Sequence, residues 1–356
     1  MSQTLTLIVP GDPEQRTGGY LYDRRITQEL RARGWRVRVV GLAGEFPLAD
    51  DVAAGAMEAA LEGLDDGDAV VIDGLALGAV PAAVLPHARR LDLSALVHHP
   101  LADETGLDEQ ARQRLLDSER RALALCRRII VTSPFTARRL QVLGLSRRKA
   151  FVVEPGVAPA ELAPAVKARL DGHPEPAREH LLCVASLTPR KGQDLLLAAL
   201  AGLESTGWCA RLSGSTRRDP AFARRIEQQR RCLELEPRVE LPGEREPAAL
   251  EADYAWATVC VLPSRYEGYG MVITEALARG LPVISTTGGA LADTLPDGAG
   301  LKIPPNDHKA LRRALSRWLD EPQLRRALTE AAATWRGRLP SWTDSARRFA
   351  QVLEQR

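Results

Sequence analysis

Short, continuously apolar segments alternate with longer amphipathic ones along this chain, and this alternation constrains its fold more than any other feature. A strand that is apolar at every position is buried on both faces, which is typical of a parallel sheet covered by helices on both sides. One set of apolar segments precedes Gly156 and a second set follows Arg178. The expected strands are Leu5–Val9, Val37–Gly41, Ala69–Asp73, Ala95–His98, Ile129–Thr132 and Phe151–Glu154, then Leu181–Ala185, Ala210–Ser213, Val239–Leu241, Val259–Leu262, Pro282–Ser285 and Gly300–Ile303.

A proline-rich stretch, residues 158–176, separates the two sets and is typical of a connection between domains. A chain of 356 residues also exceeds what one ordinary hydrophobic core supports. We therefore predict two α/β domains, each built on a doubly wound parallel sheet. The first is expected to cover residues 1–158, the linker 159–178 and the second domain 179–339.

The composition is that of a globular enzyme that we expect in the cytoplasm. Hydrophobic residues make up 45% of the chain and charged residues 26%, which are ordinary globular values. The 48 basic and 46 acidic residues nearly cancel, so we expect no nucleic-acid partner. We find no apolar run near the roughly 20 residues that span a bilayer and no signal-peptide pattern at the N-terminus.

The cysteines are scattered, without the paired spacing of a zinc site or a redox motif. We expect them to be free, buried small side chains in a reducing compartment. They are Cys126, Cys183, Cys209, Cys232 and Cys260.

The segment of residues 264–285 carries the most specific chemistry, and it lies between two expected strands. It places Glu267 and Glu275 eight residues apart, around the glycines at 268 and 270. Glycines let backbone N–H groups approach a bound group closely. A helix expected to begin near Met271 would offer unpaired N–H donors and its positive dipole end to a phosphate. Glu275, about one turn into that helix, would then reach sugar hydroxyls.

The spacing of these two glutamates, the residues that follow them and the later Thr287-Gly-Gly-Ala290 resemble the nucleotide-sugar site of retaining family 4 glycosyltransferases. The resemblance is strongest between Leu181 and Ile303 and extends along the whole chain. It implies a GT-B fold, in which two Rossmann-like domains face a cleft and the donor binds to the C-terminal domain. It also implies that residues 340–356 contain a helix that completes the N-terminal domain.

By this resemblance, Glu267 and the loop after it engage the donor sugar, and Glu275 binds the ribose. The other donor-binding residues that it implies in this segment are Gly268, Tyr269, Gly270, Met271 and Val272. A second loop is implied to border the nucleotide base, through Gly243, Glu244 and Arg245. None of these residues chooses between uracil and guanine.

Two further segments are expected to hold the diphosphate. Lys191 follows a strand and precedes a helix, and from there it could stabilise the charge that develops on a departing diphosphate. The family has an arginine five residues before this lysine, whereas this chain has Ser186. Either Arg190 supplies the second charge or the site works with one cation fewer. Gly18 and Gly19, in the loop before an expected helix Leu21–Arg33, resemble the family's glycine-rich loop beside the phosphates.

The remaining candidates lie in the N-terminal half. His98 matches the family's histidine that contacts the donor sugar near the reacting carbon, and His99 is the alternative. Arg16, His99 and Glu104 are assigned to the acceptor side. The arginine-rich stretch 108–128 and the basic residues of 138–149 leave peripheral contact with the inner face of the membrane open, although a solvated helix face is the default interpretation.

Asp66-Gly-Asp68 matches the metal-binding Asp-x-Asp motif in sequence, but it precedes an expected strand and we assign it to a turn. With Lys191 available, we expect no metal and no other cofactor.

The implied function is a retaining, metal-independent glycosyltransferase that moves a sugar from a nucleoside-diphosphate donor, with a UDP-sugar preferred, to a hydroxyl acceptor such as a glycan, a lipid or a small metabolite. Two alternatives stay open: a non-catalytic sugar-nucleotide-binding module, which Ser186 favours, and a nucleotide-sugar epimerase or a phosphorylase of the same fold.

Overall fold

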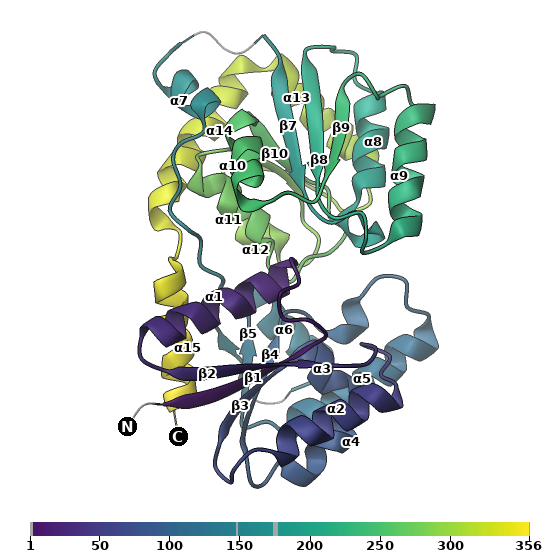
Figure 1. Cartoon of the computed structure of the whole chain (residues 1–356). Coiled ribbons are helices and arrows are strands. Elements are labelled where there is room, and N and C mark those ends of the chain that lie inside the picture. Colours follow the sequence, from purple (N-terminus) through teal and green to yellow (C-terminus); the bar gives the residue numbers. More distant parts are fainter. Residues whose placement is uncertain (1–2, 147–148, 174–176, 356) are drawn as a thin grey trace. The chain divides into compact units, whose positions relative to one another are not determined.

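A computed structural model describes residues 3–146, 149–173 and 177–355 of the chain. The chain divides into two compact units (Figure 1). Unit 1 comprises residues 1–156 and 340–356, and unit 2 comprises residues 157–339. Most of the predicted linker lies within unit 2 and contains helix α7 (Pro164–Leu170), which packs against two other helices of that unit. Residues 174–176 of the predicted linker lie outside the described residues.

Unit 1 is built on a parallel sheet of strand order β2-β1-β3-β4-β5-β6. Its strands are β1 (Thr4–Pro10), β2 (Arg36–Leu42), β3 (Ala69–Asp73), β4 (Asp92–Val97), β5 (Arg128–Val131) and β6 (Phe151–Val152). Its helices are α1 (Gly18–Ala32), α2 (Asp51–Glu62), α3 (Gly74–Ala79), α4 (Pro81–Val84), η1 (Leu85–His87), η2 (Leu101–Asp103), α5 (Glu109–Ala124), α6 (Pro134–Val142) and α15 (Trp342–Glu354). Helices α1 and α15 pack against each other, and α2, α3 and α5 enclose a core on the opposite face of the sheet (Figure 1).

Unit 2 repeats this design with the strand order β12-β11-β10-β7-β8-β9, again parallel throughout. Its strands are β7 (Glu179–Val184), β8 (Trp208–Ser213), β9 (Val239–Gly243), β10 (Val259–Leu262), β11 (Val283–Thr286) and β12 (Gly300–Ile303). Its helices, besides α7, are η3 (Pro189–Lys191), α8 (Gln193–Ala201), α9 (Pro220–Cys232), α10 (Pro247–Trp256), α11 (Met271–Ala278), α12 (Leu291–Thr294), α13 (His308–Asp320), α14 (Pro322–Trp335) and η4 (Arg336–Arg338).

The sheet of unit 2 is buried on both faces, as its apolar strands predict. Successive residues of one strand enter opposite cores: Val259 and Val261 face one core, while Cys260 and Leu262 face the other. This alternation follows from the two-residue period of a strand. The predicted pair of doubly wound parallel sheets is therefore confirmed.

The order of the strands reverses once in each sheet, and this reversal marks where a ligand can enter. In unit 1 the reversal lies between β1 and β3, and in unit 2 it lies between β7 and β10. Connections from two neighbouring strands leave in opposite directions at such a point, so that the carboxyl ends of the strands border a crevice. Residues that follow β1, β3, β7 and β10 are therefore the first candidates for a site.

Helix α15 is attached to unit 1 by side-chain and backbone contacts. Its first turn carries a capping box between Ser341 and Asp344, and the Ser345 hydroxyl donates to the Glu154 carbonyl at 2.7 Å. A Cβ on Gly156 would lie only 2.3 Å from the backbone nitrogen of Trp342. The end of the helix is held as well, because the Arg128 guanidinium donates through Nε to the Gln355 carbonyl at 3.1 Å.

The cysteines are free, as expected, but they are not all buried. Cys126, Cys183 and Cys260 lie in the cores, Cys209 is half-buried and Cys232, at the end of α9, is exposed. Within the described ranges, we find no helix whose length and apolarity would let it cross a bilayer.

The contact between Gly156 and α15 gives a test of the fold. We expect Gly156→Ala to lower the stability of unit 1 by about 1–3 kcal/mol, because the added methyl group meets backbone rather than a side chain that can move. Gly55→Ala is the control: Gly55 is an exposed residue of α2 with open space around its Cβ, so alanine should raise stability by about 0.5–1 kcal/mol. Thermal unfolding followed by circular dichroism checks both; equal midpoints for the two variants would contradict the described packing.

Candidate functional site

The switch point of unit 2 brings two segments into direct contact. Residues 188–192, after β7, lie against residues 263–267, after β10: the Arg265 N–H donates to the Arg190 carbonyl at 2.7 Å. Gly192 makes this approach possible. Its φ is +71°, and a Cβ there would lie 2.2 Å from the Pro263 carbonyl oxygen. Only glycine adopts that conformation without a steric penalty while lying so close to another backbone.

Glu267 is the centre of the polar contacts at this point. Its carboxylate accepts hydrogen bonds from Lys191 Nζ at 2.6 Å, from Ser264 Oγ at 2.7 Å and from Arg190 Nη1 at 3.2 Å. The Glu267 side chain is only 9% exposed, whereas those of Lys191 and Arg190 are 21% and 22% exposed. The two cations therefore share one buried anion and still reach solvent.

The charges set the protonation states of this group. Burial raises the pKa of Glu267, but the charges of Lys191 and Arg190 and the hydrogen bonds it accepts outweigh burial and hold the pKa at about 2. Burial lowers the pKa of Lys191 below its ordinary value, although the adjacent Glu267 opposes that effect. An ionised Glu267 beside two cation-bearing side chains leaves an excess of positive charge.

The backbone of Glu267 is fixed by the loop that follows β11. The Glu267 carbonyl accepts the Ala290 N–H at 2.8 Å, and its N–H donates to the Gly288 carbonyl at 3.3 Å. Gly289 has a φ of +67°, and a Cβ there would lie 2.3 Å from the Glu267 carbonyl oxygen. The Thr-Gly-Gly-Ala sequence thus acts structurally, by holding the glutamate in place.

Glu275 lies in α11, which begins directly after Gly270, so Met271 and Val272 form its first turn. The Tyr254 hydroxyl donates to Glu275 Oε2 at 2.7 Å, and burial raises the pKa of this tyrosine well above its ordinary value. Glu275 itself is half-buried. Its second oxygen is available to a ligand, because the tyrosine takes only one.

The loop expected at the nucleotide base shows a feature that the sequence did not reveal. Arg245 donates to the carboxylate of Asp253 at 2.9 and 3.1 Å, and Ser213 Oγ donates to the same carboxylate at 2.8 Å. Asp253 is fully buried. The Arg245 guanidinium is thus anchored inward, while Glu244 is exposed and Gly243 ends β9. Asp253 lies in an ordinary helical pattern, where no sequence signal distinguishes it from a solvated acid.

In unit 1, His98 lies between two buried carboxylates at the carboxyl ends of the strands. Its Nε2 is 3.3 Å from Asp23 Oδ1 in α1 and 3.3 Å from Asp73 Oδ2 at the end of β3. The ring meets Tyr22 edge-on at 5.5 Å. The three ligand-type atoms lie within 4.8 Å of one another, a spacing that a divalent cation could also use. In the structure the imidazole itself lies between the carboxylates.

The other predicted residues of unit 1 are more dispersed. Helix α1 begins at Gly18, so Gly18 and Gly19 form its first turn instead of the preceding loop, and a Cβ on Gly19 would lie 3.3 Å from the His98 ring. His99 pairs with Glu104 at 3.2 Å, and Arg16 is exposed. The Asp66-Gly-Asp68 segment forms a turn, in which the Asp65 N–H donates to Asp68 Oδ2.

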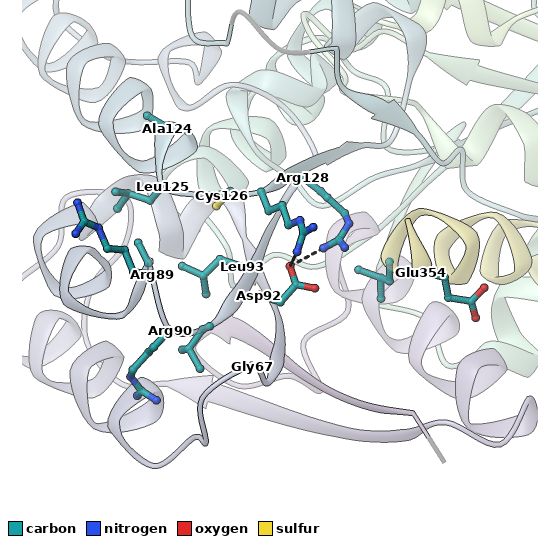
Figure 2. Close-up of a pocket in the computed structure, with 14 residues that line it drawn as sticks. Gly67, Arg89, Arg90, Asp92, Leu93, Ala124, Leu125, Cys126, Arg128 and Glu354 are labelled. Atoms are coloured by element: carbon teal, nitrogen blue, oxygen red, sulfur yellow. Dashed lines mark hydrogen bonds and ion pairs between the residues drawn. The ribbon is translucent and has the colours of Figure 1, made fainter. Parts of the chain in front are cut away.

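Several basic side chains of unit 1, inside and outside the predicted arginine-rich stretch, make structural contacts. A hollow of about 780 Å³ lies at the amino ends of β4 and β5. Figure 2 shows Arg89, Arg90 and Arg128 among the residues that line it. Arg128 is buried and donates to Asp92 at 2.7 Å, and Arg90 donates to the carbonyls of residues 61 and 64 at the end of α2. These contacts are structural. Arg147 and Arg148 lie outside the described residues.

Comparison with known proteins finds a family similarity in unit 2. Residues 169–335 match the family described as Glycosyl transferases group 1. A D-inositol 3-phosphate glycosyltransferase of Kineococcus radiotolerans is 33% identical over 215 residues, which cover 54% of this chain and 49% of the relative. The chain spans about half the length of the curated relatives it matches.

Solved structures show the fold of the whole chain. Sucrose-phosphate synthase from Thermosynechococcus elongatus superposes with a TM-score of 0.81 at 26% identity, over 98% of both chains. Anabaena HepE in complex with UDP-glucose superposes with a TM-score of 0.75 at 19% identity, over 98% of this chain and 99% of that one. The predicted GT-B fold is confirmed, and the family match falls within unit 2.

The buried Asp253 gives a test of the base-side loop. We expect Asp253→Asn to destabilise unit 2 by about 3–5 kcal/mol, because it leaves Arg245 and Arg211 around a buried group without charge. Glu240→Gln is the matched control, since Glu240 also pairs with Arg211 but its side chain is 61% exposed; we expect a change below about 1 kcal/mol. Chemical denaturation measures both, and equal losses would show that Asp253 does not anchor this loop.

Proposed function

We propose that this chain is a glycosyltransferase whose unit 2 binds a nucleoside-diphosphate sugar, with a UDP-sugar as the preferred donor. The convergence of Lys191 and Arg190 on Glu267, at the switch point of a group 1 glycosyl transferase domain, carries this proposal. The UDP and UDP-glucose complexes of HepE, which shares the fold, support a nucleotide-sugar donor.

The charges around Glu267 suit a diphosphate. Two cations and one carboxylate leave an excess of one positive charge on groups that reach solvent. A diphosphate that departs from a sugar gains negative charge, so fixed cations stabilise it most in the transition state. Lys191 is held in one place by its 2.6 Å contact with Glu267, so little reorganisation is needed when the donor binds.

The two glutamates suit the sugar and the ribose. Glu267 remains ionised at neutral pH, because its pKa is about 2, and an ionised carboxylate only accepts hydrogen bonds. It therefore fits the hydroxyls of the donor sugar beside the reacting phosphate. Glu275 has one oxygen fixed by Tyr254, which orients the other for the ribose hydroxyls.

The reaction that we propose retains the anomeric configuration and needs no metal. The bond between the anomeric carbon and the diphosphate oxygen breaks, and the acceptor oxygen bonds to that carbon on the same face. The acceptor proton passes to the departing phosphate, which supplies the base. Lys191 and Arg190 take the role that a divalent ion has in metal-dependent enzymes.

Arg190 is proposed to replace the arginine that this chain lacks at Ser186. Its guanidinium donates to the Tyr266 carbonyl as well as to Glu267, so it is held at the same point as Lys191. The alternative function, a non-catalytic sugar-nucleotide-binding module, would use the same residues for affinity alone. An epimerase would release a changed sugar nucleotide without any acceptor.

Loss of the lysine tests the proposal. Wild-type protein is screened with UDP-glucose, UDP-N-acetylglucosamine, UDP-galactose and GDP-mannose in the presence of EDTA, and release of the nucleoside diphosphate is measured. Lys191→Met should reduce that release by about 10²–10³-fold, because one fixed cation at the leaving group is removed. Lys302→Met, at an exposed lysine of the same unit paired with Asp297, should leave it unchanged. Donor binding without turnover in the wild type would favour the binding module.

A second substitution tests whether Arg190 supplies the missing charge. Arg190→Gln should lower nucleoside-diphosphate release by about 10²-fold and leave folding intact, since its side chain is 22% exposed. Arg326→Gln, at an exposed arginine of α14, is the control. Wild-type rates for Arg190→Gln would mean that the site works with Lys191 alone.

A further inference from the structure

The two buried carboxylates beside His98 are used by no step proposed so far. Asp23 and Asp73 are 5% and 6% exposed, and they come from α1 and from the end of β3. A buried carboxylate is costly unless a positive charge or hydrogen bonds compensate it. Asp73 accepts the Leu75 N–H through Oδ1, so its Oδ2 is the oxygen that meets His98.

A single ring nitrogen of His98, Nε2, contacts both carboxylates. Nε2 lies 3.3 Å from an oxygen of each, and an N–H at Nε2 can donate to both carboxylates. Burial raises the pKa of Asp23, and the charge of His98 opposes that effect. Among the described residues, Nδ1 has no hydrogen-bond partner, and the side chain is 20% exposed. Nδ1 is therefore the ring nitrogen that is left to bond a ligand.

We propose that Asp23 and Asp73 are positioning residues that keep His98 doubly protonated, so that its Nδ1–H is a permanent hydrogen-bond donor to an oxygen of the substrate and the ring cannot act as a base. The proposal rests on the proposed function, because it takes the ligand of His98 to be a sugar or acceptor hydroxyl. It assigns to the two aspartates a role that their sequence context does not indicate.

The surroundings of the ring support this assignment. Tyr22 faces it from α1, and burial raises the pKa of this phenol well above its ordinary value, so Tyr22 stays neutral. Thr132 and Thr136 donate to the backbone carbonyl of His98 and carry no charge. Within the part of the chain that the structure describes, the charged groups that contact the imidazole are thus the two aspartates. Burial lowers the pKa of His98, but the two carboxylates outweigh burial and raise the pKa to about 10.

The balance between burial and the two carboxylates sets the pH at which His98 loses its second proton. In the wild type the imidazolium is fully present below about pH 9 and is lost only as the pH rises through about 10. In a variant with Asp23→Asn and Asp73→Asn, burial remains and the two negative charges are gone. The ring then loses its proton as the pH rises through the neutral range or below it. Asparagine keeps the shape of each side chain, and its carbonyl can still accept the Leu75 N–H.

The first measurement needs no substrate. Protein labelled with ¹⁵N-histidine is titrated from pH 5.5 to 9 by NMR, and His98→Gln identifies the resonance among the six histidines. We expect no titration of His98 in the wild type and a midpoint below about pH 7 in the double variant, with Asp73→Asn alone as the second variant should the double one not fold. Titration of wild-type His98 near its ordinary value would overturn the proposal. So would a resonance that shifts with Zn²⁺ and returns with EDTA, because the cluster would then be a metal site.

The second measurement uses nucleoside-diphosphate release. The double variant should approach the wild-type rate at pH 5.5 and fall at least tenfold below it at pH 8, while the wild type stays level over that range. A loss of equal size at every pH would show a merely structural role and overturn the proposal. If the NMR result holds and the wild type turns over no donor, it is the proposed function that fails, and the pairing of His98 stands.

Discussion

A buried carboxylate shared by two cations is the interaction on which the site of unit 2 depends. Glu267 is 7% exposed, and an unpaired charge at that depth would destabilise the fold. Lys191 and Arg190 compensate it, and it fixes them where a diphosphate would need them. The glycines at 192 and 289 have the same purpose, because each lets one backbone lie close enough to another for these side chains to meet.

The sheet order explains why such different segments converge. Residues 188–192 and 263–267 are far apart in the sequence, but they follow β7 and β10, which are neighbours at the reversal of the strand order. Unit 1 uses the same principle with other residues, since Asp73 ends β3, His98 follows β4 and Asp23 lies in the helix after β1. The switch point of each doubly wound sheet therefore brings charged side chains together, and the residues at that point decide the sign of the charge.

The sequence alone was enough to predict those parts of the fold that depend on local patterns. Every expected strand is present, because uninterrupted apolar runs can be satisfied only inside a covered parallel sheet. The start of α1 was placed too late, since two glycines in succession are unfavourable in a helix interior but are tolerated in its first turn. Glu267, Lys191 and Arg190 could be found because their segments resemble a known family.

The sequence did not identify Asp253, Asp23 or Asp73 as site residues. The side chain that each one contacts lies on another element, which only the fold brings close. An acid in an amphipathic helix is normally solvated, and only the fold shows that Asp253 and Asp23 are buried. Asp73 had a weak signal, a carboxylate at the end of an apolar strand, but the same signal fits a helix cap, and it does cap α3.

The two switch points have opposite charge. In unit 2 two cations surround one carboxylate, and in unit 1 two carboxylates surround one imidazole. An anionic diphosphate is attracted by the first arrangement and repelled by the second, whereas uncharged hydroxyls can bind at either. Under the proposed function, this difference favours a diphosphate at the switch point of unit 2 and uncharged oxygens at that of unit 1. A doubly protonated His98 can make such a bond without bringing a net positive charge, because the negative charge of its two aspartates exceeds the positive charge of the ring.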